Sequence, residues 1–252
     1  MKINTNISSL TAQEAATNTN RSIASSLEKL STGLKINKAS DDASGLAIAD
    51  KLRTQVTSIN QGIANGNSAI ALLQITDKSM AEQSKILDTI KSKLIQANTD
   101  TTSTAGRTAI AKDVTKLLQQ LNNIGEQTNY NGTTLLQAKR TTADASKEAN
   151  LTAARSAKGG LSFQIGEGTQ DLIKTKTINS NVAGLKLTAL AKAVRTGAKV
   201  SAGATAGAAN VFSRILASAG QKAIDTAITT LNGYRGDVGS TQNQVESAVR
   251  NL

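Results

Sequence analysis

The sequence predicts a mainly α protein, a long antiparallel, coiled-coil-like helical rod with a small β-hairpin region in the middle of the chain. Three observations predict this fold class. The 252 residues include no proline, the residue that most strongly interrupts helices. Apolar residues recur every three or four positions over long stretches at both ends of the chain. Between those ends, a short stretch alternates apolar and polar residues as strands do.

The first predicted helix lies in residues 1–42, which also contain a connector. Its apolar residues follow steps of three and four, which we interpret as one face of a helix, and Asn4 and Thr5 are candidate N-caps. Residues 11–22 place small or polar side chains on that face, so the helix needs a partner. The predicted seam residues are Ile3, Ile7, Leu10, Ile23, Leu27, Leu30 and Leu34.

Residues 43–137 are predicted to form the N-terminal part of the rod. Gly33 ends the first helix, and Asp41 or Asp42 can cap a second one from about residue 43 to 97, roughly 80 Å long. After a short turn at 98–106, a third helix should fold back antiparallel on the second. The predicted seams are Ile59, Ile63, Ile70 and Leu73, interrupted by polar Asp77, Ser84 and Lys91, and then Ile110, Val114, Leu117 and Leu121.

Residues 138–210 differ from the rest. The stretch 161–166 alternates as a strand does, and 171–187 shows similar alternation, so a small hairpin is predicted. Gly166-Glu167-Gly168 lacks the third glycine and the Lys-Ser/Thr of a phosphate loop, which favours a hairpin turn. Residues 138–158 and 191–210 are interpreted as weakly structured surface or as an alanine-rich helix.

Residues 211–252 contain the last predicted helix, which begins between about 211 and 224. The pattern runs up to Leu252 without a glycine cap or polar tail, so we expect that more of the protein once followed. Both ends of the chain are therefore helical, with few large side chains, and neighbouring copies would have to supply the missing burial, as in a filament. The seam residues of this helix are Ile228, Leu231, Val238 and Val245.

Composition argues against an enzyme. Without cysteine or histidine there is no disulfide, no Cys/His zinc site and no histidine general acid or base, and we predict no catalytic residue, metal or cofactor. No apolar run reaches membrane-spanning length, so no membrane insertion is expected. The N-terminus has no apolar stretch typical of a cleaved secretory signal.

The net charge of +11 is concentrated in residues 138–223, where 13 basic and 4 acidic residues give +9. A basic coiled-coil nucleic-acid binder is therefore an alternative interpretation. Aromatic side chains that could stack on bases are nearly absent from this segment, so a solvated outer surface and no nucleic-acid partner are favoured.

Several motifs, in order along the chain, closely resemble bacterial flagellin. They are the opening Ile3-Asn4-Thr5-Asn6, the stretches 27–37 and 41–48 (LEKLSTGLKIN and DDASGLAI), 129–136 (NYNGTTLL), 163–166 (FQIG) and 236–243 (GDVGSTQN). The resemblance covers about 1–137, 161–187 and 224–252.

The resemblance implies a structural subunit that polymerises with copies of itself into the extracellular flagellar filament for motility. In the family, terminal helices form an inner tube (D0) and an outer rod (D1), so residues 1–42 would be D0-like and 43–137 with 211–252 D1-like. It implies unfolded secretion through type III export, with the export apparatus and the filament cap as partners. A hook–filament junction protein, which shares such ends, is the nearest alternative.

Two departures from the family pattern lead to further expectations. Flagellins continue beyond the position of Leu252 with a terminal D0 helix, so we expect this chain alone to polymerise poorly. Many flagellins also carry an arginine-rich stretch that an innate immune receptor recognises, whereas residues 86–93 (ILDTIKSK) contain no arginine. Weak receptor activation is therefore predicted.

Overall fold

The computed structural model describes residues 6–137, 159–198 and 212–252. The chain divides into two compact units, Met1–Ser58 and Ile59–Leu252. The division falls within α2 (Ala43–Asn98), sixteen residues after the predicted boundary at 42. The expected Ile3 seam position and the candidate caps Asn4 and Thr5 lie outside the described residues, as do 138–158 and 199–211.

The first unit contains α1 (Ile7–Thr32), a connector and the first turns of α2. Asn6 begins α1, because its side-chain Oδ1 accepts a hydrogen bond from the Ser9 backbone N–H at 3.3 Å. Gly33 ends the helix in the left-handed conformation, φ 70°, and its N–H donates to the Lys29 carbonyl. Asp42 Oδ1 accepts from the Gly45 N–H at 2.9 Å, so this carboxylate caps the start of α2.

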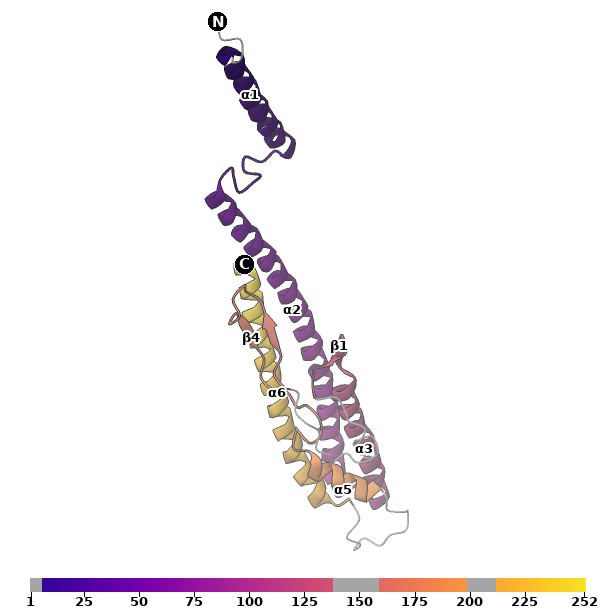
Figure 1. Cartoon of the computed structure of the whole chain (residues 1–252). Coiled ribbons are helices and arrows are strands. Elements are labelled where there is room, and N and C mark those ends of the chain that lie inside the picture. The colour runs from indigo at the N-terminus through magenta and orange to yellow at the C-terminus, as the bar shows by residue number, and fades with distance from the viewer. Residues whose placement is uncertain (1–5, 138–158, 199–211) are drawn as a thin grey trace. The chain divides into compact units, whose positions relative to one another are not determined.

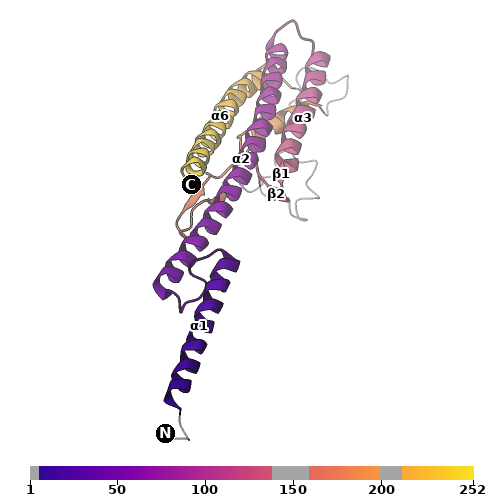
Figure 2. The same ribbon diagram turned by 90° about the horizontal axis from the view of Figure 1, so that it is seen from above.

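The second unit is built around three long helices (Figure 1). They are α2 from Ile59 onward, α3 (Thr104–Gln127) and α6 (Arg214–Asn251). Both views show α3 and α6 running beside α2 (Figure 1, Figure 2). Polar contacts establish that each pair is antiparallel. α3 meets α2 through the Lys93–Asp113 ion pair and the Gln83–Leu121 hydrogen bond. α6 meets α2 through the Arg235–Asp77 and Lys91–Asp225 ion pairs.

The turn between α2 and α3 is held by Arg107. Its Nε donates to the Ala97 carbonyl at 3.0 Å and its Nη2 to the Thr99 carbonyl at 2.9 Å. Ala97 lies in the last turn of α2, where carbonyls have no intrahelical partner. Ser103 caps α3 by accepting from the Gly106 N–H at 3.1 Å. The short turn therefore satisfies both helix ends and fixes the antiparallel return.

The buried seam of α2 follows an unbroken alternation of four and three residues. At alternate positions of the predicted seam, the buried residue is the one before the predicted residue. Ile63 and Ile70 are half-buried, and the small residues before them are buried. Asp77, Ser84 and Lys91, which were predicted to interrupt the seam, lie beside it, because each follows a buried residue. The seam residues are Gly62, Gly66, Ala69, Leu73, Thr76, Met80, Gln83, Leu87, Ile90, Leu94 and Ala97, and Leu72 beside the seam is buried as well.

Two glycines of this seam allow close packing. A Cβ at Gly62 would lie 1.9 Å from the Ile165 carbonyl oxygen, and one at Gly66 would lie 2.2 Å from a methyl of Val249 in α6. Real Cβ atoms do not approach this closely. At Gly62 the neighbouring atom is backbone, so the position requires glycine, whereas at Gly66 a larger residue would have to displace the Val249 side chain. The side chain of Asn65, between them, donates to the Gln164 carbonyl at 3.1 Å and attaches the following hairpin to α2.

That hairpin is the predicted one. β3 (Ser162–Gln164) pairs antiparallel with β4 (Leu172–Lys174), with Phe163 opposite Ile173. Gly166 and Gly168 lie in its turn, where Asp171 Oδ2 accepts from the Gly168 N–H at 2.8 Å. The Gly166-Glu167-Gly168 stretch is thus a hairpin loop.

A second, smaller hairpin follows α3. β1 (Asn129–Tyr130) pairs antiparallel with β2 (Thr133–Thr134) around Asn131-Gly132, whose φ values are 48° and 77°. Two positive φ values are characteristic of a type I′ turn, which Asn-Gly favours. The Asn-Gly dipeptide is a signal for such a hairpin, which was not among the predicted elements.

α5 (Thr188–Ala198) is the alanine-rich helix that was one of two interpretations of its segment. It packs against α3 and α6, and Gly197 lies against Phe212, a fully buried aromatic that closes this end of the bundle. Figure 1 shows α5 in orange near α3. The described core is thus continuous from the β3–β4 hairpin to α5.

Candidate assembly surface

The predicted seam residues of the second unit are used inside the chain. Ile59, Ile63, Ile70, Leu117 and Ile228 are half-buried. The others are buried in the helical bundle, namely Leu73, Ile110, Val114, Leu121, Leu231, Val238 and Val245. They stabilise the subunit's own fold and are not available to a partner.

The seam residues of the first unit are exposed instead. No residue of α1 is buried. Exposed fractions of the apolar side chains range from 51% at Ile23 to 80% at Leu30. Full burial of each such side chain is worth about 1.5–3 kcal/mol. The exposed predicted residues are Ile7, Leu10, Ile23, Leu27, Leu30 and Leu34.

The spacing was interpreted as one face of a helix, but these residues do not share one face of α1. The helix is continuous from Ile7 to Thr32, and each residue turns about 100° around its axis. The thirteen residues from Leu10 to Ile23 therefore rotate the chain by about 220° beyond whole turns. We define patch A as Ile7 and Leu10, and patch B as Ile23, Leu27 and Leu30. The two patches lie on nearly opposite sides of the helix.

The start of α2 adds a third exposed row that the sequence analysis missed. Ile48, Leu52 and Val56 are 59%, 56% and 57% exposed. They follow steps of four, and Ile59 three residues later continues the row, so the pattern was present in the sequence. The first unit thus exposes apolar side chains on both of its helices.

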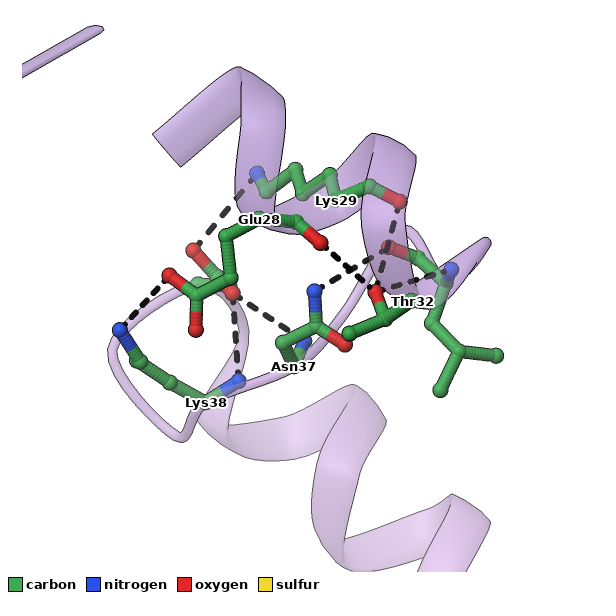
Figure 3. A network of polar contacts seen from close by, with 7 residues as sticks. Glu28, Lys29, Thr32, Asn37 and Lys38 are labelled. Atoms are coloured by element: carbon green, nitrogen blue, oxygen red, sulfur yellow. Dashed lines mark hydrogen bonds and ion pairs between the residues drawn. The ribbon is translucent and has the colours of Figure 1, made fainter. Parts of the chain in front are cut away.

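A polar network folds the connector onto the end of α1 (Figure 3). Lys38 Nζ pairs with Glu28 Oε2 at 2.7 Å, and Lys29 Nζ with Asp41 Oδ1 at 3.6 Å. Asp41 Oδ2 also accepts from the backbone N–H groups of Asn37 and Lys38 at 3.1 and 3.2 Å. Of the two aspartates predicted as helix caps, Asp42 therefore caps α2 and Asp41 organises the connector.

The same contacts shift two pKa values. Hydrogen bonds from the Asn37 and Lys38 backbone, helped by the charge of Lys29, hold the pKa of Asp41 below its ordinary value of 3.8. The hydrogen bond to Glu28 and its negative charge raise the pKa of Lys38 above 10.5. The connector is thus stabilised in the charged forms of both groups.

A pH titration should report this network. Folding lowers the pKa of Asp41. Its contribution to the stability of the connector is therefore fully present above pH 3.8 and is lost as the pH falls through the lower pKa of the folded state. The contribution of Lys38 to the stability of the connector is fully present below pH 10.5 and is lost as the pH rises through the raised pKa of Lys38. We expect the Asn37 and Lys38 amide resonances to be constant between these limits and to shift with a midpoint below 3.8 in acid.

The control for this titration is Asp41→Asn, in which the acid transition of both amides should disappear. Added salt should move the midpoint little, since backbone hydrogen bonds are the main cause of the shift. A wild-type midpoint at or above 3.8 would contradict the network.

The described residues show no grouping suited to metal chemistry. Within 6–137, 159–198 and 212–252, no three acidic, histidine or cysteine side chains come together. In the same ranges, no helix combines the length and apolar character needed to cross a membrane. A wide, open surface groove between α2 and α6 is lined by residues such as Gln74, Ile75 and Gln242.

A helical bundle that keeps its own core, joined to a helix with two uncovered apolar patches, defines a structural protein assembled through helices. Comparison with known proteins specifies it further. A sequence-family model for the "bacterial flagellin N-terminal helical region" matches residues 3–141, more than half of the chain. The chain belongs to the bacterial flagellin family, whose members are structural proteins and not enzymes.

Individual relatives agree with this assignment. Flagellin A of Helicobacter mustelae is 42% identical over 204 residues, covering 81% of this chain and 39% of that protein. Flagellin FlaB1 of Treponema pallidum is 30% identical over the whole chain and 81% of its own length. The chain thus spans well under half of the Helicobacter relative's length.

Solved structures show the same fold. The crystal structure of Bacillus cereus flagellin superposes with a TM-score of 0.53 at 22% identity, covering 75% of this chain and 89% of the other. A putative flagellar hook-associated protein from Vibrio parahaemolyticus gives 0.61 at 14% identity, covering 85% and 93%. At these identities the likeness concerns the fold alone.

Proposed function

We propose that this chain is a structural subunit that polymerises with its own copies into the extracellular bacterial flagellar filament and so serves motility. The observation that carries the proposal is the exposure of patches A and B on α1 in a chain of the flagellin family. A monomer that leaves both sides of one helix apolar is stabilised by neighbours on both sides. A polymer in which each copy meets several others provides such neighbours.

Secretion belongs to the same proposal. A filament subunit of this kind leaves the cell through the flagellar type III export apparatus and is added beneath the filament cap. The first unit supports passage in an unfolded form, because α1 has no buried side chain that would resist unfolding.

The alternative role at the hook–filament junction has one supporting observation, the shared fold with the putative hook-associated protein. The match to the flagellin N-terminal region favours the filament subunit. No specific contact among the described residues favours a nucleic-acid partner, and Lys176, one of the basic residues of the middle segment, pairs with Asp237 at 2.8 Å.

Electron microscopy of the purified 252-residue chain at raised concentration and salt tests the proposal. Sedimentation velocity over a concentration series tests self-association even if long filaments are scarce, as the sequence analysis expects. A sedimentation coefficient that increases with concentration, and helical filaments on the grid, are the supporting results. A monodisperse monomer at all concentrations would contradict the proposed function.

Weak activation of the innate immune receptor is a further prediction. In residues 86–93, the two basic side chains are engaged in ion pairs, Lys91 with Asp225 at 2.6 Å and Lys93 with Asp113 at 3.3 Å. Reporter cells carrying the receptor should respond weakly to the unmodified chain, and more strongly to the variant Thr89→Arg, at an exposed position. A response equal to that of a potent agonist from the unmodified chain would refute this prediction.

A further inference from the structure

The chain contains three Asn-Gly dipeptides, Asn65-Gly66, Asn131-Gly132 and Asn232-Gly233. Asparagine is a thermolabile residue, because the main-chain nitrogen of the next residue can attack its side-chain amide. Glycine favours this attack, since it has no Cβ to hinder it. Whether the attack occurs depends on the freedom of the local backbone and on the hydrogen bonding of the attacking N–H. The fold places the three dipeptides in different environments.

Two of the three dipeptides lie inside long helices. Asn65-Gly66 belongs to α2 and Asn232-Gly233 to α6, both far from a helix end. In a helix interior, each N–H donates to the carbonyl four residues earlier, and the backbone dihedral angles are fixed. The Asn65 side chain is held as well, since it donates to the Gln164 carbonyl at 3.1 Å and accepts from Gln61 at 2.9 Å. Both helices therefore protect their asparagine from attack.

Asn131-Gly132 instead forms the turn between β1 and β2. Both residues are exposed, and a Cβ at Gly132 would meet no atom within 4 Å. Among the residues that the structure describes, no hydrogen bond engages the Asn131 side chain or the Gly132 N–H. Each strand of this hairpin has only two residues, so the turn can open locally while the helical bundle stays folded. The attacking nitrogen and the amide carbon are then free to meet.

We propose that Asn131 is a site of spontaneous deamidation in the folded chain. The Gly132 main-chain nitrogen gives its proton to solvent and forms a bond to Asn131 Cγ. The bond from Cγ to the side-chain nitrogen breaks, and that nitrogen leaves as ammonia. Water then opens the five-membered imide at either of its carbonyls. Opening at one carbonyl gives aspartate, and opening at the other gives isoaspartate, in which the main chain runs through the former side chain.

The two products should differ in structure. Aspartate adds a negative charge but keeps the hairpin, since Asp-Gly also favours a type I′ turn. Isoaspartate adds one atom to the main chain within a two-residue loop, so the pairing of Tyr130 with Thr133 is lost. The next residues are Leu135, whose N–H donates to the Thr128 carbonyl at 3.2 Å, and the buried Leu136. Isoaspartate should therefore weaken the attachment of this segment to the end of α3.

Peptide mapping by mass spectrometry tests the proposal on the full chain, aged at mildly alkaline pH with and without urea. In the folded chain, conversion to aspartate or isoaspartate should be at least about tenfold faster at Asn131 than at Asn65 or Asn232, whose helices must open first. In urea, the three sites should react at similar rates. Equal rates in the folded chain, or a preference for Asn131 that persists in urea, would overturn the proposal.

Asn131→Gly is the matched control, because Gly-Gly also favours this turn and carries no side-chain amide. The fast phase of ammonia release from the folded chain should disappear in this variant, and its persistence would also overturn the proposal. Asn131→Asp separates the effect of charge from that of the longer main chain. The amide resonances of Thr133 and Thr134 should stay close to those of fresh protein in this variant and should shift in the isoaspartate fraction of aged protein.

Discussion

The double variant Leu27→Asp/Leu30→Asp is expected to abolish self-association while leaving the helical bundle folded. Both residues belong to patch B and are 58% and 80% exposed, so the substitutions disturb no core of the subunit. In a polymer, each aspartate would be buried against apolar neighbours without a partner, which costs several kcal/mol per contact. Sedimentation velocity should show a monomer at every concentration, and the thermal unfolding midpoint of the second unit should be unchanged.

Ser22→Asp is the matched control on the same helix. Ser22 is exposed and lies roughly 60° around the axis from the nearest residue of patch A and roughly 80° from the nearest residue of patch B. If this control self-associates nearly as well as the wild type, the loss in the double variant is due to the apolar patch and not to the added negative charge on α1. An equal loss in the control and the double variant would reject the assignment of patch B as an assembly surface. The same design with Ile7 and Leu10 examines patch A.

The second large effect is expected from Gly62→Ala. Its methyl group would overlap the carbonyl oxygen of Ile165, and because that oxygen belongs to the backbone, the β3–β4 hairpin must move away from α2. We expect a loss of about 1–3 kcal/mol in the free energy of unfolding, the range for overpacked cores. Urea denaturation followed by circular dichroism measures it.

Gly233→Ala provides the comparison, since an added Cβ there meets nothing within 4 Å. It should stabilise the chain by about 0.5–1 kcal/mol, because alanine is the better helix former. The two variants introduce the same chemical change into helix interiors, so opposite signs isolate packing from propensity. Stabilisation by Gly62→Ala would contradict the close contact between α2 and the hairpin.

The periodicity of the sequence was sufficient to predict the helices and the β3–β4 hairpin, because both depend on local patterns. It was not sufficient to predict which residues occupy the seams. A hydrophobicity pattern favours Ile63 and Ile70, whereas the structure buries Gly62 and Ala69, since close approach between elements selects small side chains. Hydrophobicity carries no information on the distance between helices.

The candidate surface was predictable in its residues but not in its geometry. Steps of three and four identified the apolar residues of α1, yet the gap from Leu10 to Ile23 changes the face, which only a continuous helix makes evident. Buried polar groups were harder still. Gln83 and Gln137 have no apolar signature, and their burial depends on partners such as Asn181 and Ser180 that are far away in the sequence.

The pairing of α2 with α6 has a consequence for folding kinetics. The Arg235–Asp77 ion pair joins residues 158 positions apart, whereas α2 and α3 are connected by a short turn. Closing the long loop is entropically the more expensive step, so the α2–α3 hairpin should form first and docking of α6 should limit the rate. With no proline in the sequence, no slow peptide-bond isomerisation competes with that step. The described core should therefore form soon after α6 becomes available to dock on α2 and α3.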